Sequence, residues 1–140
     1  MKKIFALTFI LGFSLTLSAQ EPVQEAETKI ESDIIDFPDV EAEFKGGRDE
    51  MMKFISNNVQ YPFEARKDGI QGRVYMSFVV KKSGRITNIH VERGVHEVLD
   101  EAATEVIKMM PRWRPAEKDG EKVNCRVRLP IAFMLDSSVE

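Results

Sequence analysis

The sequence of 140 residues is poor in cysteine, in long apolar runs and in excess charge of either sign. Its single cysteine, Cys125, excludes a fold held together by intrachain disulfides. No apolar run reaches the roughly 17 to 25 residues that span a bilayer, which excludes a polytopic membrane protein. Twenty basic residues against 23 acidic ones leave no positive excess of the kind that predicts nucleic-acid binding. What remains is a small globular chain, too short for two ordinary domains.

The first 19 residues have the pattern of a secretory signal peptide. Lys2 and Lys3 precede an apolar run of 14 residues, which ends in the small residues Ser18 and Ala19. We therefore expect cleavage after Ala19 and an exported protein. The alternative is an uncleaved membrane anchor, for which 14 apolar residues are few.

Charge then divides the rest of the chain. Residues 20–40 carry seven acidic side chains against one lysine, and this stretch is interpreted as a flexible, solvated arm with Ile34, Ile35 and Phe37 as its candidate contacts to the domain. The folded domain is expected over residues 41–135, about the size at which one small core supports itself. Residues 136–140 form a tail.

Two patterns of apolar residues predict the elements of this domain. Helical periodicity predicts three helices, over residues 47–58, 63–67 and 97–110. Strict alternation predicts three strands, over residues 73–80, 86–92 and 123–133. A short polar loop joins the first two strands, so they must be antiparallel neighbours. The expected fold class is α+β: a small three-stranded, antiparallel-type sheet with helices packed on one face.

The last strand carries a proline in its outward parity. The inward candidates are Val123, Cys125, Val127, Leu129, Ile131 and Phe133. Pro130 shares the opposite parity with Asn124, Arg126 and Arg128, and a strand proline is confined to edges or bulges because it has no N–H. If Pro130 faces an open edge, the backbone groups of the other three residues face it too. The arginines either protect this edge from aggregation or attract an extended peptide that adds a strand to it.

Six motifs resemble, in the same order, those of the C-terminal domain of TonB-type energy transducers. They are Gln60-Tyr61-Pro62, Gly69-Ile70-Gln71-Gly72-Arg73-Val74, Phe78-Val79-Val80 with Ser83-Gly84-Arg85-Ile86, Leu99-Asp100-Glu101-Ala102, Met110-Pro111-Arg112-Trp113-Arg114-Pro115, and Leu129-Pro130-Ile131-Ala132-Phe133. Together they cover nearly all of the expected domain.

The resemblance implies a periplasmic module of a Gram-negative cell that acts in TonB-dependent transmembrane transport. Members of the family bind the TonB box, an extended segment of outer-membrane receptors, by adding it as a strand to their last strand. The partner expected here is such a receptor or another exported protein. The peptide-binding residues that the resemblance implies are Gln60, Tyr61, Pro62, Val123, Asn124, Cys125, Arg126, Val127, Arg128 and Leu129.

The chain also departs from a complete transducer of this family. Such a protein has an uncleaved N-terminal transmembrane helix that meets the ExbB–ExbD motor, and a long proline-rich spacer. Here a cleavable-looking leader and a short arm with only Pro22 and Pro38 stand in their place. We therefore expect a stand-alone exported module without direct motor contact. The alternatives are a structural domain that forms a homodimer through the same edge, and an anchored transducer if the leader is retained.

The search for catalytic and metal-binding motifs returns nothing that selects a site. The sequence contains no nucleophile elbow, phosphate-binding loop or dinucleotide fingerprint. His90 and His96 are not accompanied by ligands at metal-site spacing. Cys125, on the inward parity, is interpreted as a small hydrophobic residue. We expect no enzyme activity, no cofactor and no metal.

Overall fold

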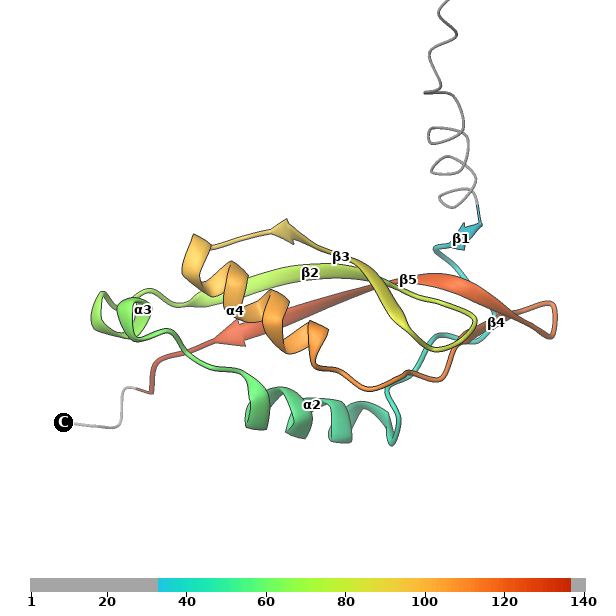
Figure 1. The fold of residues 1–140 in the computed structure, drawn as a ribbon, viewed down its shortest axis with the longest axis horizontal. Helices are drawn as coiled ribbons and strands as arrows, with labels where there is room; N and C mark the ends of the chain where they lie inside the picture. Colours follow the sequence, from blue (N-terminus) through green and yellow to red (C-terminus); the bar gives the residue numbers. More distant parts are fainter. Residues whose placement is uncertain (1–32, 137–140) are drawn as a thin grey trace, which may run out of the picture.

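A computed structural model describes residues 33–136 of the chain. The predicted leader, the first part of the acidic arm and nearly all of the tail lie outside the described residues. None of the helices in residues 33–136 has the length and hydropathy needed to cross a membrane. The elements, shown in Figure 1, are in chain order β1 (Ile34–Ile35), α2 (Gly47–Asn58), α3 (Phe63–Lys67), β2 (Gly72–Val80), β3 (Ile86–Arg93), α4 (Glu97–Lys108), β4 (Ala116–Lys118) and β5 (Glu121–Phe133).

The three predicted helices are confirmed, and α4 shows why the local sequence forms one. At its N-terminus the His96 side chain accepts a hydrogen bond from the backbone N–H of Val98. Glu97 and Asp100 lie in the first turn and Lys108 in the last, so each charge is at the helix end where the helix dipole stabilises it. The helix ends at Lys108, two residues before the predicted end. Its apolar stripe is buried: Leu99, Ala103, Val106 and Ile107.

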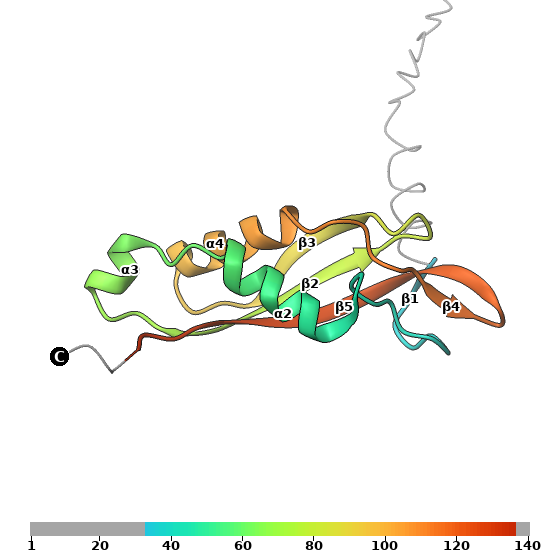
Figure 2. The same ribbon diagram turned by 90° about the horizontal axis from the view of Figure 1, so that it is seen from below.

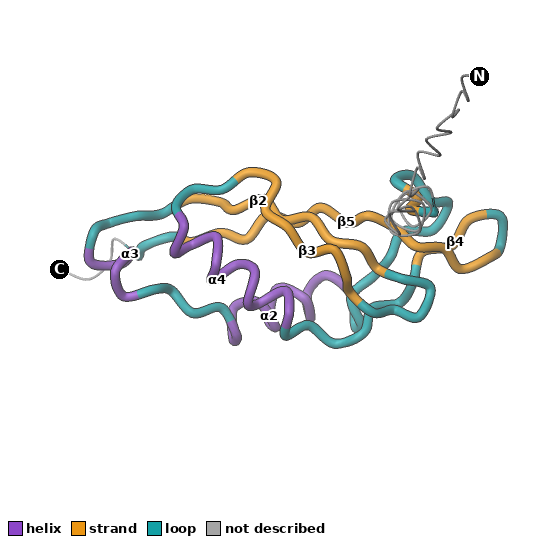
Figure 3. Tube along the Cα trace, turned by 45° about the horizontal axis from the view of Figure 1, so that its top comes forward, coloured by secondary structure: helices purple, strands orange, loops and turns teal. Residues whose placement is uncertain are grey.

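The predicted α+β class is confirmed, whereas the sheet has five strands within residues 33–136 instead of three. The strand order is β1-β5-β2-β3, with β4 paired to β5. The predicted β2–β3 hairpin is antiparallel, and β5 is antiparallel to β2. β1 and β4 were not predicted, because strands of two and three residues are too short to show alternation. Figure 3 shows that the β4–β5 hairpin extends from the end of the sheet opposite α3.

β2 is buried on both faces from Met76 to Val80, although alternation predicted a half-buried strand; Arg73 and Tyr75, before this stretch, are exposed as predicted. Met76 and Phe78 belong to the core that α4 covers. On the other face Ser77 is 1% exposed and Val79 4%. The reason lies in the neighbouring strands, since Arg128 of β5 pairs across β2 with Glu92 of β3, at 3.1 Å between Nε and Oε1. The apolar stem of a long side chain can cover a strand residue in this way.

The acidic arm joins the domain before the predicted boundary at residue 41. Ile34 and Ile35 form β1, and Val40 makes an antiparallel bridge to Glu117. Phe37, the third candidate contact, is 86% exposed. The folded domain therefore includes at least residues 34, 35 and 40. A solvated arm was expected because acidic charge dominates the stretch, but short backbone pairing does not depend on composition.

One end of the core depends on a close approach between two loops. Trp113 stacks edge-on against Phe44 and Phe78, with ring centroids 5.8 and 5.4 Å away. Its backbone N–H donates to the carbonyl of Gly84 in the β2–β3 loop, at 2.9 Å. Gly84 has φ +82°, and a Cβ there would lie 2.2 Å from the Trp113 carbonyl oxygen. Only glycine satisfies both conditions.

Gly84→Ala should therefore lower the free energy of unfolding by about 3 kcal/mol, because alanine is strained at a positive φ and its Cβ would also clash with the Trp113 backbone. Gly120→Ala is the matched control, because Gly120 has φ +78° but open space around its Cβ position. Gly120→Ala should lower the free energy of unfolding by only about 1 kcal/mol. Urea unfolding curves of the two variants measure the difference. Equal losses would show that the contact with Trp113 constrains nothing.

Candidate functional site

The candidate site is the side of β5 that faces away from β2. On this side β1 pairs in parallel with Asn124 and Cys125, whereas β4 pairs with residues 121–123, of which Glu121 and Val123 have the parity that faces β2. Within residues 33–136 no strand pairs with residues 126–133 on this side. Residues 126–133 therefore form an unpaired edge about eight residues long, roughly 26 Å at 3.3 Å per residue.

The register of β5 against β2 decides which backbone groups this edge presents. Pairing runs without a bulge from Val80 opposite Cys125 to Gly72 opposite Phe133. Pro130 lies opposite Tyr75, and having no N–H it must occupy a non-hydrogen-bonded pair. Residues of the same parity then direct their N–H and C=O groups away from β2. Along the open edge these are Arg126, Arg128 and Ala132, with the carbonyl of Pro130 between them.

A groove of about 600 Å³ runs beside the open edge. Residues 127–130 and Ala132 of β5 form one wall, and Met51 and Met52 of α2 lie across from them. Seen from below in Figure 2, α2 lies along β5. Phe44 and Trp113 also line the groove, and both belong to the buried core. The open backbone groups thus lie next to an apolar surface on which alternate side chains of an added strand could rest.

Arg126 and Arg128 are held by carboxylates on the face of the sheet that the core does not use. Nε of Arg126 lies 3.4 Å from Oδ1 of Asp36, and Nη2 of Arg128 lies 3.6 Å from the same oxygen. Arg128 also pairs with Glu92. The Arg126 side chain is 22% exposed and its Nε, although buried, has no hydrogen bond of good geometry. Both arginines therefore already have acidic partners, and one of these partners, Asp36, belongs to the acidic arm.

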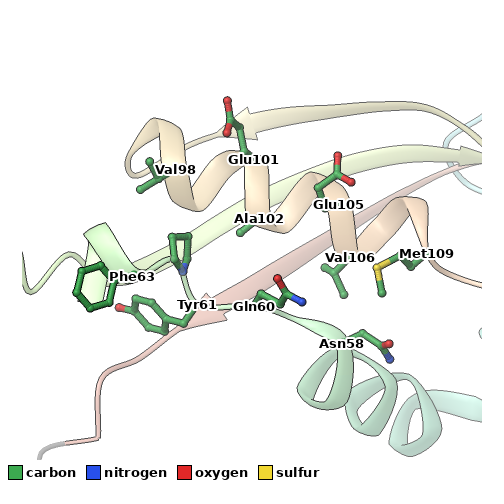
Figure 4. Close-up of a pocket in the computed structure, with 11 residues that line it drawn as sticks. Asn58, Gln60, Tyr61, Phe63, Val98, Glu101, Ala102, Glu105, Val106 and Met109 are labelled. Atoms are coloured by element: carbon green, nitrogen blue, oxygen red, sulfur yellow. The ribbon is translucent and has the colours of Figure 1, made fainter. Parts of the chain in front are cut away.

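Gln60-Tyr61-Pro62 lies at the far end of β5. The Tyr61 hydroxyl donates to the carbonyl of Ile70, and its ring packs edge-on against Phe133, the last residue of β5. Gln60 is exposed and lines a second hollow between this segment and α4, shown in Figure 4. Tyr61 thus anchors the end of the edge strand, whereas Gln60 borders a different surface.

The structure therefore brings together only part of the predicted set. Arg126, Val127, Arg128 and Leu129 lie on the open edge or its groove. Of the three preceding residues, Val123 pairs with β4, Asn124 with β1, and Cys125 with both β1 and β2. Asp36, Phe44 and the methionines of α2 were not predicted as site residues from the sequence. The one local signal for Asp36 was its place directly after the only isoleucine pair in the acidic stretch.

Cys125 is 3% exposed and its thiol donates to the carbonyl of Arg126, at 3.4 Å. Burial raises the pKa of this thiol, the carboxylates of Asp36 and Glu41 raise it further, and a backbone hydrogen bond at Ala42 opposes them. The thiol therefore stays protonated at neutral pH, as the interpretation of Cys125 as a small hydrophobic residue requires.

This shift predicts a pH dependence of stability. In the unfolded chain the thiol ionises near pH 8.5, whereas in the folded chain it keeps its proton to higher pH. The stability that the neutral thiol contributes is complete below that pH, and above it falls by up to about 1.4 kcal/mol per pH unit. Urea unfolding at pH 7 and pH 9.5 should show this loss for the native chain, relative to Cys125→Ala. Parallel pH profiles for the two proteins would contradict it.

Comparison with known proteins adds the family context. Residues 57–135 match the family described as Gram-negative bacterial TonB protein C-terminal. "Protein TonB" of Xanthomonas campestris pv. campestris (strain B100) is 32% identical over 81 residues, which is 57% of this chain and 36% of that protein. "Protein TonB" of Helicobacter pylori (strain J99) is 35% identical over 82 residues, 58% of this chain and 28% of that one. The chain thus matches about a third of the length of these relatives.

A solved structure is also similar. The NMR solution structure of a Helicobacter pylori TonB C-terminal domain is 31% identical, with a TM-score of 0.49 over 62% of this chain and 78% of that one. The family match begins at residue 57, so β1 and nearly all of α2 lie before it.

Proposed function

Because the chain belongs to the family of TonB C-terminal domains, we propose that it binds an extended segment of an outer-membrane receptor, or of another exported protein, by strand addition at residues 126–133 of β5. The process served is TonB-dependent transport, in the periplasm. The observation that carries this proposal is the bulge-free register of β5, which turns a row of backbone groups toward an unpaired edge.

The edge offers a guest strand both main-chain hydrogen bonds and a place for its side chains. Outward N–H and C=O groups of Arg126 and Arg128 would pair with the guest backbone. Alternate guest side chains would enter the groove above Phe44 and Met51, which are 6% and 8% exposed. The others would lie on the face that carries the two arginines, where acidic guest residues are favoured. No cofactor or chemical step is required by this mode of binding.

Tyr61 has a supporting role in the proposal. Through its contact with Phe133 it fixes the C-terminal end of β5, where a guest that follows the whole edge would finish. Gln60 and Pro62, the neighbours of Tyr61 in the chain, line the hollow beside α4, so a guest would reach them only by continuing past Phe133.

A second candidate function rests on the same open edge, which could pair with its counterpart in another copy of the chain. In that case the domain would be a structural homodimer. Titration of isotope-labelled protein with synthetic N-terminal segments of outer-membrane receptors separates the two. Saturable backbone shifts at residues 126–133 and in α2 support the guest, whereas concentration-dependent self-association without response to any peptide supports the dimer.

Arg128→Pro tests the direction of the backbone groups. Proline there removes one outward N–H and leaves a guest carbonyl unpaired, so peptide affinity should fall about ten- to a hundredfold. The position shares the parity of Pro130, and for this reason the β2 ladder stays intact.

Arg128→Ala is the matched control, because it removes the side chain but keeps the N–H. It should weaken the same peptide only a few-fold, as loss of an exposed charge does. Circular dichroism verifies that both variants fold. If the proline and alanine variants bound peptide equally well, the residue-128 amide would not face a guest and the docking assignment would be wrong.

A further inference from the structure

β1 lies on the outer side of β5 directly before the unpaired edge at residues 126–133. Ile34 lies opposite Asn124 and Ile35 opposite Cys125, in parallel register, at the place where Figure 1 shows β1 beside β5. Asp36 follows directly after β1, and its carboxylate lies 3.4 Å from the Nε of Arg126, the residue after Cys125. A short segment of this chain therefore makes the two kinds of contact proposed for an external guest, strand pairing and charge pairing.

Backbone hydrogen bonds just after this segment hold the chain to the domain, whereas its own pairing with β5 is short. Downstream, the backbone N–H groups of Asp39 and Val40 both donate to the carbonyl of Glu117 at 3.0 Å. Between this anchor and β1, Phe37 is exposed. The strand has two residues, and the Asp36 side chain is 43% exposed. Ion pairs so close to water contribute little. β1 can therefore leave β5 while the chain beyond it stays attached.

An external guest and β1 need the same backbone groups. Outward parity gives the donors Asn124, Arg126 and Arg128 in succession, and Pro130 then interrupts the row because it has no N–H. The longest uninterrupted set of donors thus begins at Asn124, which lies opposite Ile34. A guest that uses the whole set must take the place of β1 and of the Asp36 carboxylate.

Building on the proposed function, we propose that residues 34–36 are an internal guest that external segments must displace. The segments that displace it best are extended, run parallel to β5, and place two branched aliphatic residues before a carboxylate that meets Arg126. The internal guest lowers the apparent affinity of every external one by the fraction of time it occupies the edge. Because it is tethered, its effective concentration is on the order of millimolar. Only guests delivered at comparable local concentration, or with a matching acidic residue, compete well.

Ile35→Cys tests this directly with a reversible lock. Residues 35 and 125 are register partners on adjacent strands, about 4.8 Å apart in such a pair, within the range of roughly 4.4–6.8 Å that a disulfide bridges. Oxidation should therefore join residue 35 to Cys125 and fix β1 on the edge. The probe is a blocked synthetic peptide with the sequence of residues 33–38, Asp-Ile-Ile-Asp-Phe-Pro. We expect binding by the reduced variant and at least tenfold weaker binding by the oxidised one.

The native chain under the same oxidising and reducing conditions is the control, because its single cysteine forms no such bridge. A peptide in which Asn replaces the second Asp should bind the reduced variant several-fold more weakly. Equal peptide affinity before and after oxidation would overturn the internal guest, since the edge would then accept strands with β1 in place. By contrast, failure of every receptor segment to bind any form, while the probe peptide still obeys the lock, would count against the proposed function alone.

Asp36→Asn releases the internal guest without new chemistry. Loss of the pairs with Arg126 and Arg128 should strengthen binding of the probe peptide by about two- to fivefold, the range that exposed ion pairs allow. Asp33→Asn, a change at an exposed residue one position before β1, is the matched control and should leave the affinity unchanged. Unchanged or weaker binding by Asp36→Asn would show that Asp36 does not hold the edge.

Discussion

The missing amide hydrogen of Pro130 is the constraint on which the arrangement of the last strand depends. A proline can lie opposite Tyr75 only where the ladder with β2 requires no donor. Since the register has no bulge, this one position fixes the direction of every backbone group from Cys125 to Phe133. Any second neighbour along this stretch, a guest included, finds one donor missing from the row at Pro130. The edge is thus built into the strand.

An unpaired edge can aggregate with other chains as well as bind a guest strand, and different parts of this edge are protected in different ways. At its start the outer side of β5 is covered by β1, which is too short to present a long edge of its own. The rest is flanked by α2 and the groove. The two interpretations of Arg126 and Arg128, protection and attraction, are therefore compatible. Paired with Asp36 and Glu92, the arginines cover Ser77 and hold the arm; released from Asp36, they would face a guest.

The elements with strong local patterns were predictable. α4 has an apolar stripe and an acidic first turn, and β5 alternates so strictly that Cys125, Ile131 and Phe133 are buried as expected. The elements without such patterns were not. β1 consists of two isoleucines in an acidic stretch, and β4 of three residues before the turn at Asp119-Gly120. The burial of Ser77 was also unforeseen, because it results from an ion pair between two other strands.

For the candidate site, the sequence by itself determined the parity of β5 and the identity of the residues on its outward side. Alternation and the chemistry of Pro130 are properties of consecutive residues, so they need no knowledge of the rest of the chain. Only the tertiary structure decided which stretch of that edge is vacant. Vacancy depends on whether distant segments, here Ile34–Ile35, come to lie against that side of β5. Such contacts are a few backbone hydrogen bonds long, and no local pattern of side chains encodes where they form.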